Sequence, residues 1–327
     1  MKKLFKSFIP PFLIYLKTAL PNYYYDLKLY YKYSASMGLN NKTKLIARII
    51  KLYHTIEKGL TMPEVRLGFG KKNLISLIEL NNRYIRLYGN KDTQIQHSVA
   101  VVLEYKVFHK KKGYEIDDEL IDLIDKQVAK MNNLLASEQK KVTSKSYFQH
   151  TSSSFEEFSW SRASVRNYTN EDVSIDLLIK AVDIARNTPS VCNRQTAKAY
   201  IFSNKEKIQE ILTLQGGNRG FGHLTNKLIV ITAELGVFAE LSERNQAFVD
   251  GGMFAMNMLY ALHSKKIAAC IMNCSHTYQK DLKMRKSTQI KKSEVFIAMI
   301  SCGLTPDNFK IALSKRKNLD DYLTILK

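Results

Sequence analysis

The stretch from Trp160 to Tyr200 constrains this chain most, because it carries two polar groups on either side of a helix-like segment. The first group places Arg162, Ser164 and Arg166 at alternate positions. Guanidinium groups are planar and permanently charged, so they suit a phosphate or an electron-rich ring edge. The second group, Pro189 to Gln195, offers short polar side chains in a turn-prone segment whose backbone N–H groups can bind a ligand. The two groups together predict the two ends of a pocket for a phosphorylated, polar-edged cofactor.

This order of R-x-S-x-R, one helix and P-S-x-x-N-x-Q resembles the FMN-dependent nitroreductase family. The resemblance extends over residues 160–327 through three later segments. The segment Val249–Gly252, together with the helical run Met253–Leu262, looks like the family's central helix. The segment Phe296–Gly303 looks like the family's late core strand, and Ser314–Lys317 looks like its terminal basic cluster. One departure follows the central helix, where the family usually has L-G-[LI]-G-[TS] and this chain has Ser264 to Ala269 without a glycine. The missing glycines predict less room beside the cofactor.

The resemblance implies what the chain binds and does. It implies an FMN cofactor, NADH or NADPH as electron donor, and a small electron-poor acceptor. Hydride would pass directly to and from the flavin N5 in a ping-pong cycle, so no side chain is assigned as a catalytic acid, base or nucleophile. The family also implies a homodimer with the flavin at the subunit interface, in the cytoplasm.

The resemblance further assigns cofactor-binding residues. The R-x-S-x-R positions are expected at the phosphate and ring-edge side, and the P-S-x-x-N-x-Q positions at the ring and ribityl chain. The basic cluster is expected to close on the phosphate. The assigned residues are Arg162, Ser164, Arg166, Ser190, Asn193, Gln195, Lys315 and Arg316.

No metal ligand is assigned. Cys270-x-x-x-Cys274-x-His276 lacks the usual C-x-x-C spacing and a fourth ligand. The four cysteines of the chain predict buried or free thiols in a reducing compartment rather than a disulfide framework.

Residues 1–150 are predicted to form a mostly α-helical region of unknown role. Apolar residues at a spacing of three and four predict a helix from Thr43 to Glu57 that stops at Gly59, and further helices at 72–88, 94–109 and 117–136. His54 and Glu57 lie one helical turn apart, which favours a structural contact over a ligand site. Longer nitroreductase-like chains with H-x-I-E-K-G-L, here residues 54–60, resemble proteins found with surface-polysaccharide biosynthesis enzymes.

The polar stretch Gln139–Ser154 shows no periodicity and predicts a linker to the domain at 155–327. That domain is predicted to be α/β (α+β), a nitroreductase-like mixed sheet flanked by helices. The expected helices are 173–187, 205–214 and 247–263, and the expected strands are 198–203, 228–232, 267–272 and 294–301.

The formal net charge of +20 favours anionic partners. Residues 1–150 contribute 26 Lys and Arg against 13 Asp and Glu, but no nucleic-acid motif accompanies them. An anionic glycan or a membrane surface therefore stays open as a partner of this basic region, beside a plain solvated surface. The apolar run Phe8–Leu16 is too short to span a bilayer and is interrupted by Pro10 and Pro11. It predicts a helix that packs on its own domain or lies on a membrane surface.

Two other functions remain open at this point. One is a non-catalytic flavin- or glycan-associated component of a surface-polysaccharide assembly system, which the missing glycines at 266–269 favour. The other is a basic protein that binds membrane surfaces.

Overall fold

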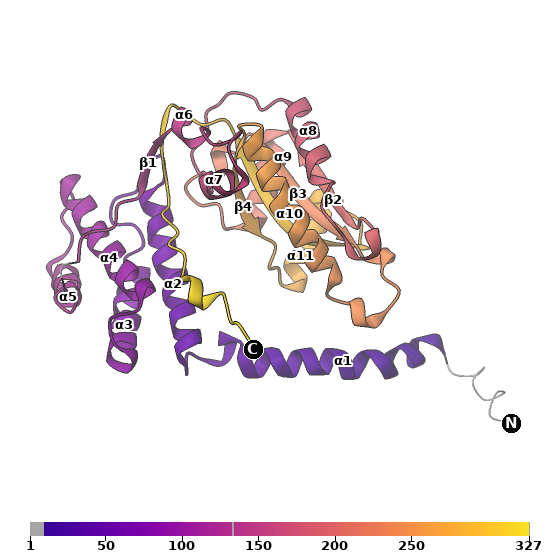
Figure 1. Cartoon of the computed structure of the whole chain (residues 1–327), viewed down its shortest axis with the longest axis horizontal. Coiled ribbons are helices and arrows are strands. Elements are labelled where there is room, and N and C mark those ends of the chain that lie inside the picture. Colours follow the sequence, from indigo (N-terminus) through magenta and orange to yellow (C-terminus); the bar gives the residue numbers. More distant parts are fainter. Residues whose placement is uncertain (1–9, 133, 327) are drawn as a thin grey trace.

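A computed structural model describes residues 10–132 and 134–326 of the chain. A helical region and an α/β region lie side by side, and the long first helix leads away from the other helices and runs below the α/β region (Figure 1). The helical region contains α1 (Pro11–Tyr33), α2 (Lys42–Leu60), α3 (Lys71–Tyr88), α4 (Thr93–Lys111) and α5 (Asp118–Val128). The predicted α/β fold preceded by a mostly α-helical region is confirmed.

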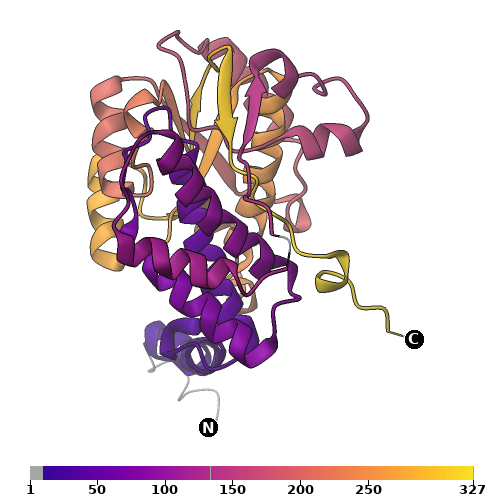
Figure 2. The same ribbon diagram turned by 90° about the vertical axis from the view of Figure 1, so that its left-hand side faces the viewer.

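Helices α2 to α5 pack around one apolar core, which Figure 2 shows from the side of these helices. The three- and four-residue spacing of α2 places Leu45, Ile49 and Ile56 on its buried face, and all three are fully buried. Asn41 caps this helix by accepting a hydrogen bond from the backbone N–H of Lys44 at 2.9 Å. Sequence periodicity therefore located this core well.

Helix α1 is exposed along most of its length. Large apolar side chains such as Tyr24, 66% exposed, and Tyr30, 68% exposed, point to solvent. An ion pair between Asp26 and Arg244, with 2.7 Å between Oδ2 and Nε, joins the helix to the α/β region. The expectation that the N-terminal helix packs on its own domain is wrong for the described residues 10–33. Residues 1–9, which include the start of the apolar run Phe8–Leu16, lie outside the described residues.

The main sheet has the strand order β2-β3-β5-β4, and each neighbouring pair is antiparallel. Its strands are β2 (Ala197–Phe202), β3 (Lys227–Glu234), β4 (Ala268–Asn273) and β5 (Glu294–Gly303). Alternation along β3 directs Leu228 and Val230 to one apolar cluster and Ile229 and Ile231 to another. The sheet is therefore buried on both faces.

Helices cover both faces of this sheet. Helices α8 (Ile175–Ala185) and α10 (Gln246–Ser264) share the cluster of Ile229 and Ile231, while α9 (Lys205–Gln215) and α11 (Tyr278–Thr288) share the cluster of Leu228 and Val230. The short helix α7 (Phe155–Ser161) precedes the first polar group. Short 3-10 helices lie at η2 (Ala35–Met37), η3 (Val191–Asn193), η4 (Gly222–Leu224), η5 (Leu235–Val237), η6 (Leu241–Glu243) and η7 (Leu319–Asp321).

The predicted linker at 139–154 is wrong. Its residues form β1 (Lys140–Thr143) and α6 (Ser144–Tyr147), and β1 pairs antiparallel with β6 (Asn308–Ile311). The pairing partner lies more than 160 residues away in the sequence, so the local pattern contained no signal of the strand. Tyr147 is buried and its hydroxyl donates to the carbonyl of Ala163 at 2.7 Å.

Two predicted helix ends in the helical region are also wrong. Helix α2 continues through Gly59 to Leu60 and is capped by Thr61, because Gly59 packs closely against Phe69 rather than terminating the helix. The helix expected at 117–136 ends at Val128. Helix α11 and strand β6 were not predicted at all.

Candidate functional site

The first polar group lies along the edge of the main sheet. Helix α7 ends at Ser161, and Arg162 follows in an extended conformation. The backbone N–H of Val165 donates to the carbonyl of Ala269 on β4 at 3.0 Å, which holds the segment against that strand. Arg162, Ser164 and Arg166 thus lie on an extended segment that is hydrogen-bonded to β4.

Arg162 is a cation without an observed counter-ion. Its Nε is buried and has no hydrogen-bond partner among the described residues. The neighbouring His263 carries no charge at pH 7, because burial and then the Arg162 charge lower its pKa to about 4. Ser161 Oγ lies 2.8 Å from His263 Nε2, which fixes the two side chains next to each other. A half-buried guanidinium with an unpaired Nε is suited to bind an anion.

Arg166 is more deeply buried than Arg162, with 7% of its surface exposed. It pairs with no carboxylate in the part of the chain that the structure describes, and it lies beside the thiol of Cys270 on β4. Burial raises the pKa of that thiol, although the charges of Arg166 and Lys58 act in the opposite direction. The thiol therefore does not neutralise Arg166 at pH 7.

The second polar group forms a strained loop after α8. Cys192, Asn193 and Gln195 have φ values of 50°, 54° and 52°, the left-handed region that non-glycine residues seldom adopt. Ser190 stabilises the turn, since its Oγ accepts from the backbone N–H of Gln195 at 2.8 Å. Strain of this kind is concentrated at ligand-binding and catalytic sites. The side chains of Asn193 and Gln195 are exposed.

Asp250 of α10 anchors this loop and was not assigned from the sequence. Its buried carboxylate accepts the backbone N–H of Val191 at 3.2 Å from Oδ2 and the side-chain amide of Gln246 at 2.7 Å from Oδ1. The Val249–Gly252 motif contains this residue, so the motif was a usable signal. Asp250 positions the loop through the backbone.

The two polar groups lie at opposite ends of α10 within one chain. Asp250 contacts the second group near the start of the helix, and His263 contacts the residue before Arg162 near its end. These positions are 13 residues apart, which corresponds to about 20 Å at 1.5 Å per residue. A single chain does not bring the two predicted ends of the pocket together.

The predicted basic cluster lies against the helical region. The C-terminal segment runs alongside α2 (Figure 1), and the Gln94 side-chain amide of α4 donates to the carbonyl of Arg316 at 3.1 Å and of Lys315 at 3.5 Å. The side chains of Lys315 and Arg316 are exposed. Their predicted role at the phosphate stays a prediction.

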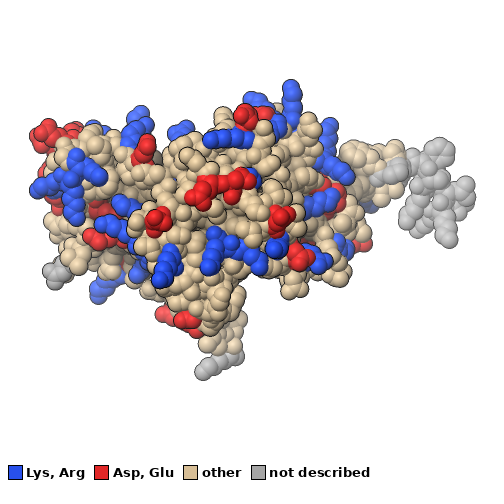
Figure 3. Space-filling view, turned by 90° about the horizontal axis from the view of Figure 1, so that it is seen from above, with Lys and Arg blue, Asp and Glu red and all other residues tan. Residues whose placement is uncertain are grey.

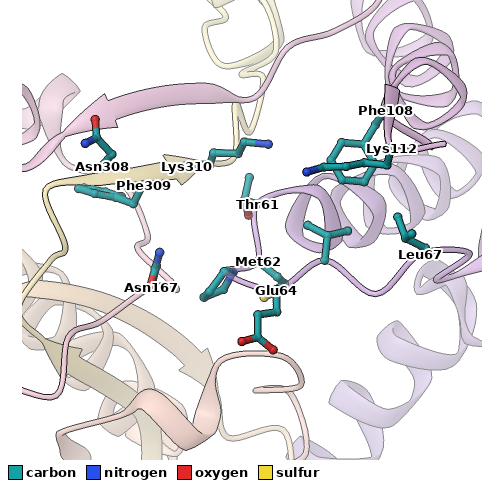
Figure 4. A pocket seen from close by; sticks show the side chains of 12 residues that line it. Thr61, Met62, Glu64, Leu67, Phe108, Lys112, Asn167, Asn308, Phe309 and Lys310 are labelled. Atoms are coloured by element: carbon teal, nitrogen blue, oxygen red, sulfur yellow. The ribbon is translucent and has the colours of Figure 1, made fainter. Parts of the chain in front are cut away.

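A cavity of about 520 Å³ separates the helical region from the α/β region (Figure 4). Its lining includes Thr61 and Met62 after α2, Phe108 of α4, Asn167, and Phe309 of β6. None of the eight predicted cofactor-binding residues lines it, but Asn167 directly follows Arg166. The segment that follows α2 and the residue that follows Arg166 therefore line the same cavity.

The glycine-free segment after α10 retains one conformational feature that favours glycine. Lys266 adopts a φ of 57°. Ile267, Ala268 and Ala269 are buried and lead into β4. The backbone turn is thus made without glycine, while the methyl groups of the two alanines occupy space there.

Comparisons with known proteins agree with the α/β region. Residues 161–304 match the sequence model of the nitroreductase family. The matched part ends before Lys315 and Arg316 and excludes the helical region. No curated protein matches the chain. The family match confirms the nitroreductase-like part of the predicted fold and supports an oxidoreductase.

Solved structures with a similar fold are distant in sequence. A nitroreductase family protein from Streptococcus pneumoniae is 17% identical, with a TM-score of 0.46, and the alignment covers 53% of this chain and 100% of that one. An FMN-dependent nitroreductase from Clostridium difficile is 20% identical, with a TM-score of 0.41, over 51% of this chain and 92% of that one.

Proposed function

We propose that the protein is an FMN-dependent oxidoreductase that accepts electrons from NADH or NADPH and passes them to a small electron-poor acceptor. The observation that carries this proposal is the half-buried Arg162 guanidinium, whose buried Nε has no partner in the described structure. A buried unpaired donor of this kind is costly unless a ligand pairs with it. The phosphate of FMN has the charge and the acceptor oxygens that Arg162 requires.

The residues present fit an FMN molecule. Arg162, Ser164 and Arg166 would hold its phosphate and the polar edge of its ring, and Ser190, Asn193 and Gln195 would hold the ring and ribityl chain. When bound, FMN supplies hydride chemistry that no amino-acid side chain can perform. The protein's own residues bind and orient the cofactor, and none of them need act as an acid, base or nucleophile.

The proposed function requires a homodimer. In one chain the two polar groups contact α10 at positions about 20 Å apart along the helix. Between these ends, α10 exposes Phe248 and Val249, each 52% exposed, together with Met253. The adjoining α8 exposes Ile179. A second copy placed antiparallel on this apolar face would bring the first group of one subunit to the second group of the other.

A membrane surface is a second candidate partner, and α1 is the observation that favours it. The helix combines exposed aromatic side chains with Lys17, Lys28 and Lys32, a composition found in helices at membrane surfaces. Across the described residues, no helix has the length and apolar character needed to cross a membrane. On the face shown in Figure 3, basic and acidic side chains are interspersed.

We place the protein in the cytoplasm, at its membrane surface if α1 binds lipid, because its four cysteines are free thiols. Cosedimentation of the full chain with anionic vesicles, compared with neutral vesicles and with α1 deleted, tests the lipid contact. Binding that requires anionic lipid and α1, and that weakens with salt, supports it. Equal binding by the deletion variant contradicts it.

The visible absorbance of the purified protein tests the main proposal. A flavin spectrum that bleaches when NADH or NADPH is added without oxygen supports an oxidoreductase. A spectrum that persists with both donors supports a non-catalytic flavin protein instead. A colourless protein that stays colourless after incubation with FMN contradicts the proposal.

A further inference from the structure

Lys58, in the last turn of α2, lies near enough to Arg166 of the α/β region for the two charges to interact. Its side chain is partly buried and forms no hydrogen bond or ion pair within residues 10–132 and 134–326. Burial lowers the pKa of the Lys58 ammonium, and the nearby Arg166 charge lowers it further. The helical region thus contributes a cation to the first polar group.

The fold fixes this neighbourhood. Thr61 and Met62, which follow α2 directly, line the same cavity as Asn167 (Figure 4). Met62 also packs against the apolar cluster that contains the fully buried Val165. The segment that follows α2 is therefore held against the α/β region by apolar packing, independently of any charge.

The two cations have no counter-ion in the described structure. Arg166 is 7% exposed and lacks a carboxylate partner, and the Cys270 thiol beside both cations has a raised pKa because it is buried. Two like charges held together away from water repel each other and lose hydration, which disfavours the charged pair. A bound anion removes both penalties.

We propose that Lys58 and Arg166 form a cationic pair that binds an anionic part of the flavin nucleotide, so that the helical region completes the cofactor site. This inference rests on the proposed FMN-dependent function. The anionic part is either the phosphate or the ring edge that takes up negative charge when the flavin is reduced. The same pair of cations could bind either anionic group. Riboflavin has the ring but lacks the phosphate, so its affinity distinguishes the two.

A purely structural role is the alternative. A lysine in the last turn of a helix interacts favourably with the helix macrodipole, and this would account for Lys58 without a ligand. In that case removing the charge lowers the stability of the protein and leaves flavin affinity unchanged. Flavin binding and thermal stability must therefore be measured on the same proteins.

The test compares full-length wild type with Lys58→Gln, Lys58→Arg and the control Lys51→Gln. Lys51 lies on the same helix and its side chain is exposed, so the control removes an equal charge away from Arg166. FMN and riboflavin are titrated into each flavin-free protein by fluorescence, and the melting temperature and the midpoint potential of the bound flavin are recorded.

We expect Lys58→Gln to bind FMN about tenfold to a hundredfold more weakly, as loss of one charge-assisted contact predicts, with Lys58→Arg close to wild type. If the phosphate is the ligand, riboflavin affinity stays unchanged. If the ring edge is the ligand, riboflavin affinity falls as well and the midpoint potential becomes more negative. The inference is overturned if the wild type binds FMN and Lys58→Gln matches Lys51→Gln in both FMN affinity and midpoint potential. A wild type that does not bind flavin overturns the proposed function itself.

Discussion

The buried carboxylate of Asp250 accepts the backbone N–H of Val191, with 3.2 Å between Oδ2 and the nitrogen, and ties the Pro189–Gln195 loop to the start of α10. Thirteen residues later His263 adjoins the residue before Arg162. Helix α10 therefore acts as a rigid spacer between the two halves of the proposed site. Under the proposed function, the two halves of one site would therefore come from different subunits.

Mixed dimers should restore flavin binding that each parent variant lacks. Arg162→Gln removes the first half of the site and Asn193→Gly the second, and glycine preserves the left-handed backbone at φ 54°. After unfolding and refolding an equal mixture, half of the dimers combine the two variants, and each of these has one intact site. About one quarter of all sites should then bind FMN, as measured by bound flavin per chain.

The controls for this experiment are the two variants refolded separately, which should each bind little flavin at the same FMN concentration. A mixture that binds no more than the separate variants would contradict a site shared between subunits. Size-exclusion chromatography of the mixture confirms that dimers are present.

Arg162→Gln should weaken FMN binding without weakening the flavin-free protein. One charge-assisted hydrogen bond contributes roughly 1.5–3 kcal/mol, which corresponds to about a tenfold to hundredfold loss of affinity. In the flavin-free state the buried Nε has no partner, so its removal should leave the melting temperature unchanged or higher. Fluorescence titration and thermal melting of the flavin-free variant measure the two effects.

The matched control is Arg186→Gln, which removes an exposed arginine whose partner is Asp183. Such surface pairs contribute little, so both affinity and melting temperature should equal those of the wild type. A lower melting temperature for Arg162→Gln with normal FMN affinity would assign Arg162 a structural role.

Glu57→Gln should make stability less dependent on pH in the acidic range. Burial raises the pKa of the Glu57 carboxyl, but hydrogen bonds from His54 at 3.1 Å and His97 at 2.8 Å outweigh it, so the pKa lies below the usual 4.5. A carboxyl with a depressed folded-state pKa stabilises the fold above its unfolded-state pKa, and this contribution is lost as the pH falls through the folded-state value.

At pH 7 we expect Glu57→Gln to lower the free energy of unfolding by about 1–3 kcal/mol, because it replaces a buried charged acceptor of two part-buried hydrogen bonds. Urea denaturation from pH 7 down to pH 3 should show the wild type losing this advantage below about pH 4.5. The control is Glu79→Gln on α3, an exposed residue. A constant difference between Glu57→Gln and wild type at every pH would contradict the assignment.

The sequence predicted the elements that have a local signature. The spacing of Leu45, Ile49 and Ile56 located α2, and the predicted strand at 228–232 lies within β3. It did not predict β1, because four residues form a strand only through pairing with β6 at the far end of the chain. Helix α11 was not predicted for a different reason, because its sequence YQKDLKMRKST is mostly polar and shows no clear apolar face.

The candidate site was likewise predicted only where the sequence has a local signature. The R-x-S-x-R and P-S-x-x-N-x-Q spacings located two polar groups, but spacing cannot tell on which end of α10 each group lies. Lys58 could not be assigned either, since its proximity to Arg166 depends on how α2 packs against the α/β region. Contacts between regions are decided by tertiary packing, which no local pattern encodes.

Gly59→Ala should destabilise the protein even though alanine favours helices. In a helix interior the change would normally stabilise by about 1 kcal/mol. Here a methyl carbon would lie 2.0 Å from Cε2 of Phe69, whose ring packs edge-on against Tyr105 with 5.4 Å between ring centroids. The phenyl ring must move, so we expect a net loss of about 1–3 kcal/mol in the free energy of unfolding, measured by urea denaturation.

Phe69→Leu provides the decisive comparison, because a shorter side chain leaves room for the added methyl group only if the ring is the obstacle. Gly59→Ala combined with Phe69→Leu should then cost less than the sum of the two single changes, as expected for residues in direct contact. Additive costs would mean that Gly59 is constrained by something other than Phe69. Contact with Phe69 would then no longer explain why α2 continues to Leu60, through the turn that carries Lys58 toward Arg166.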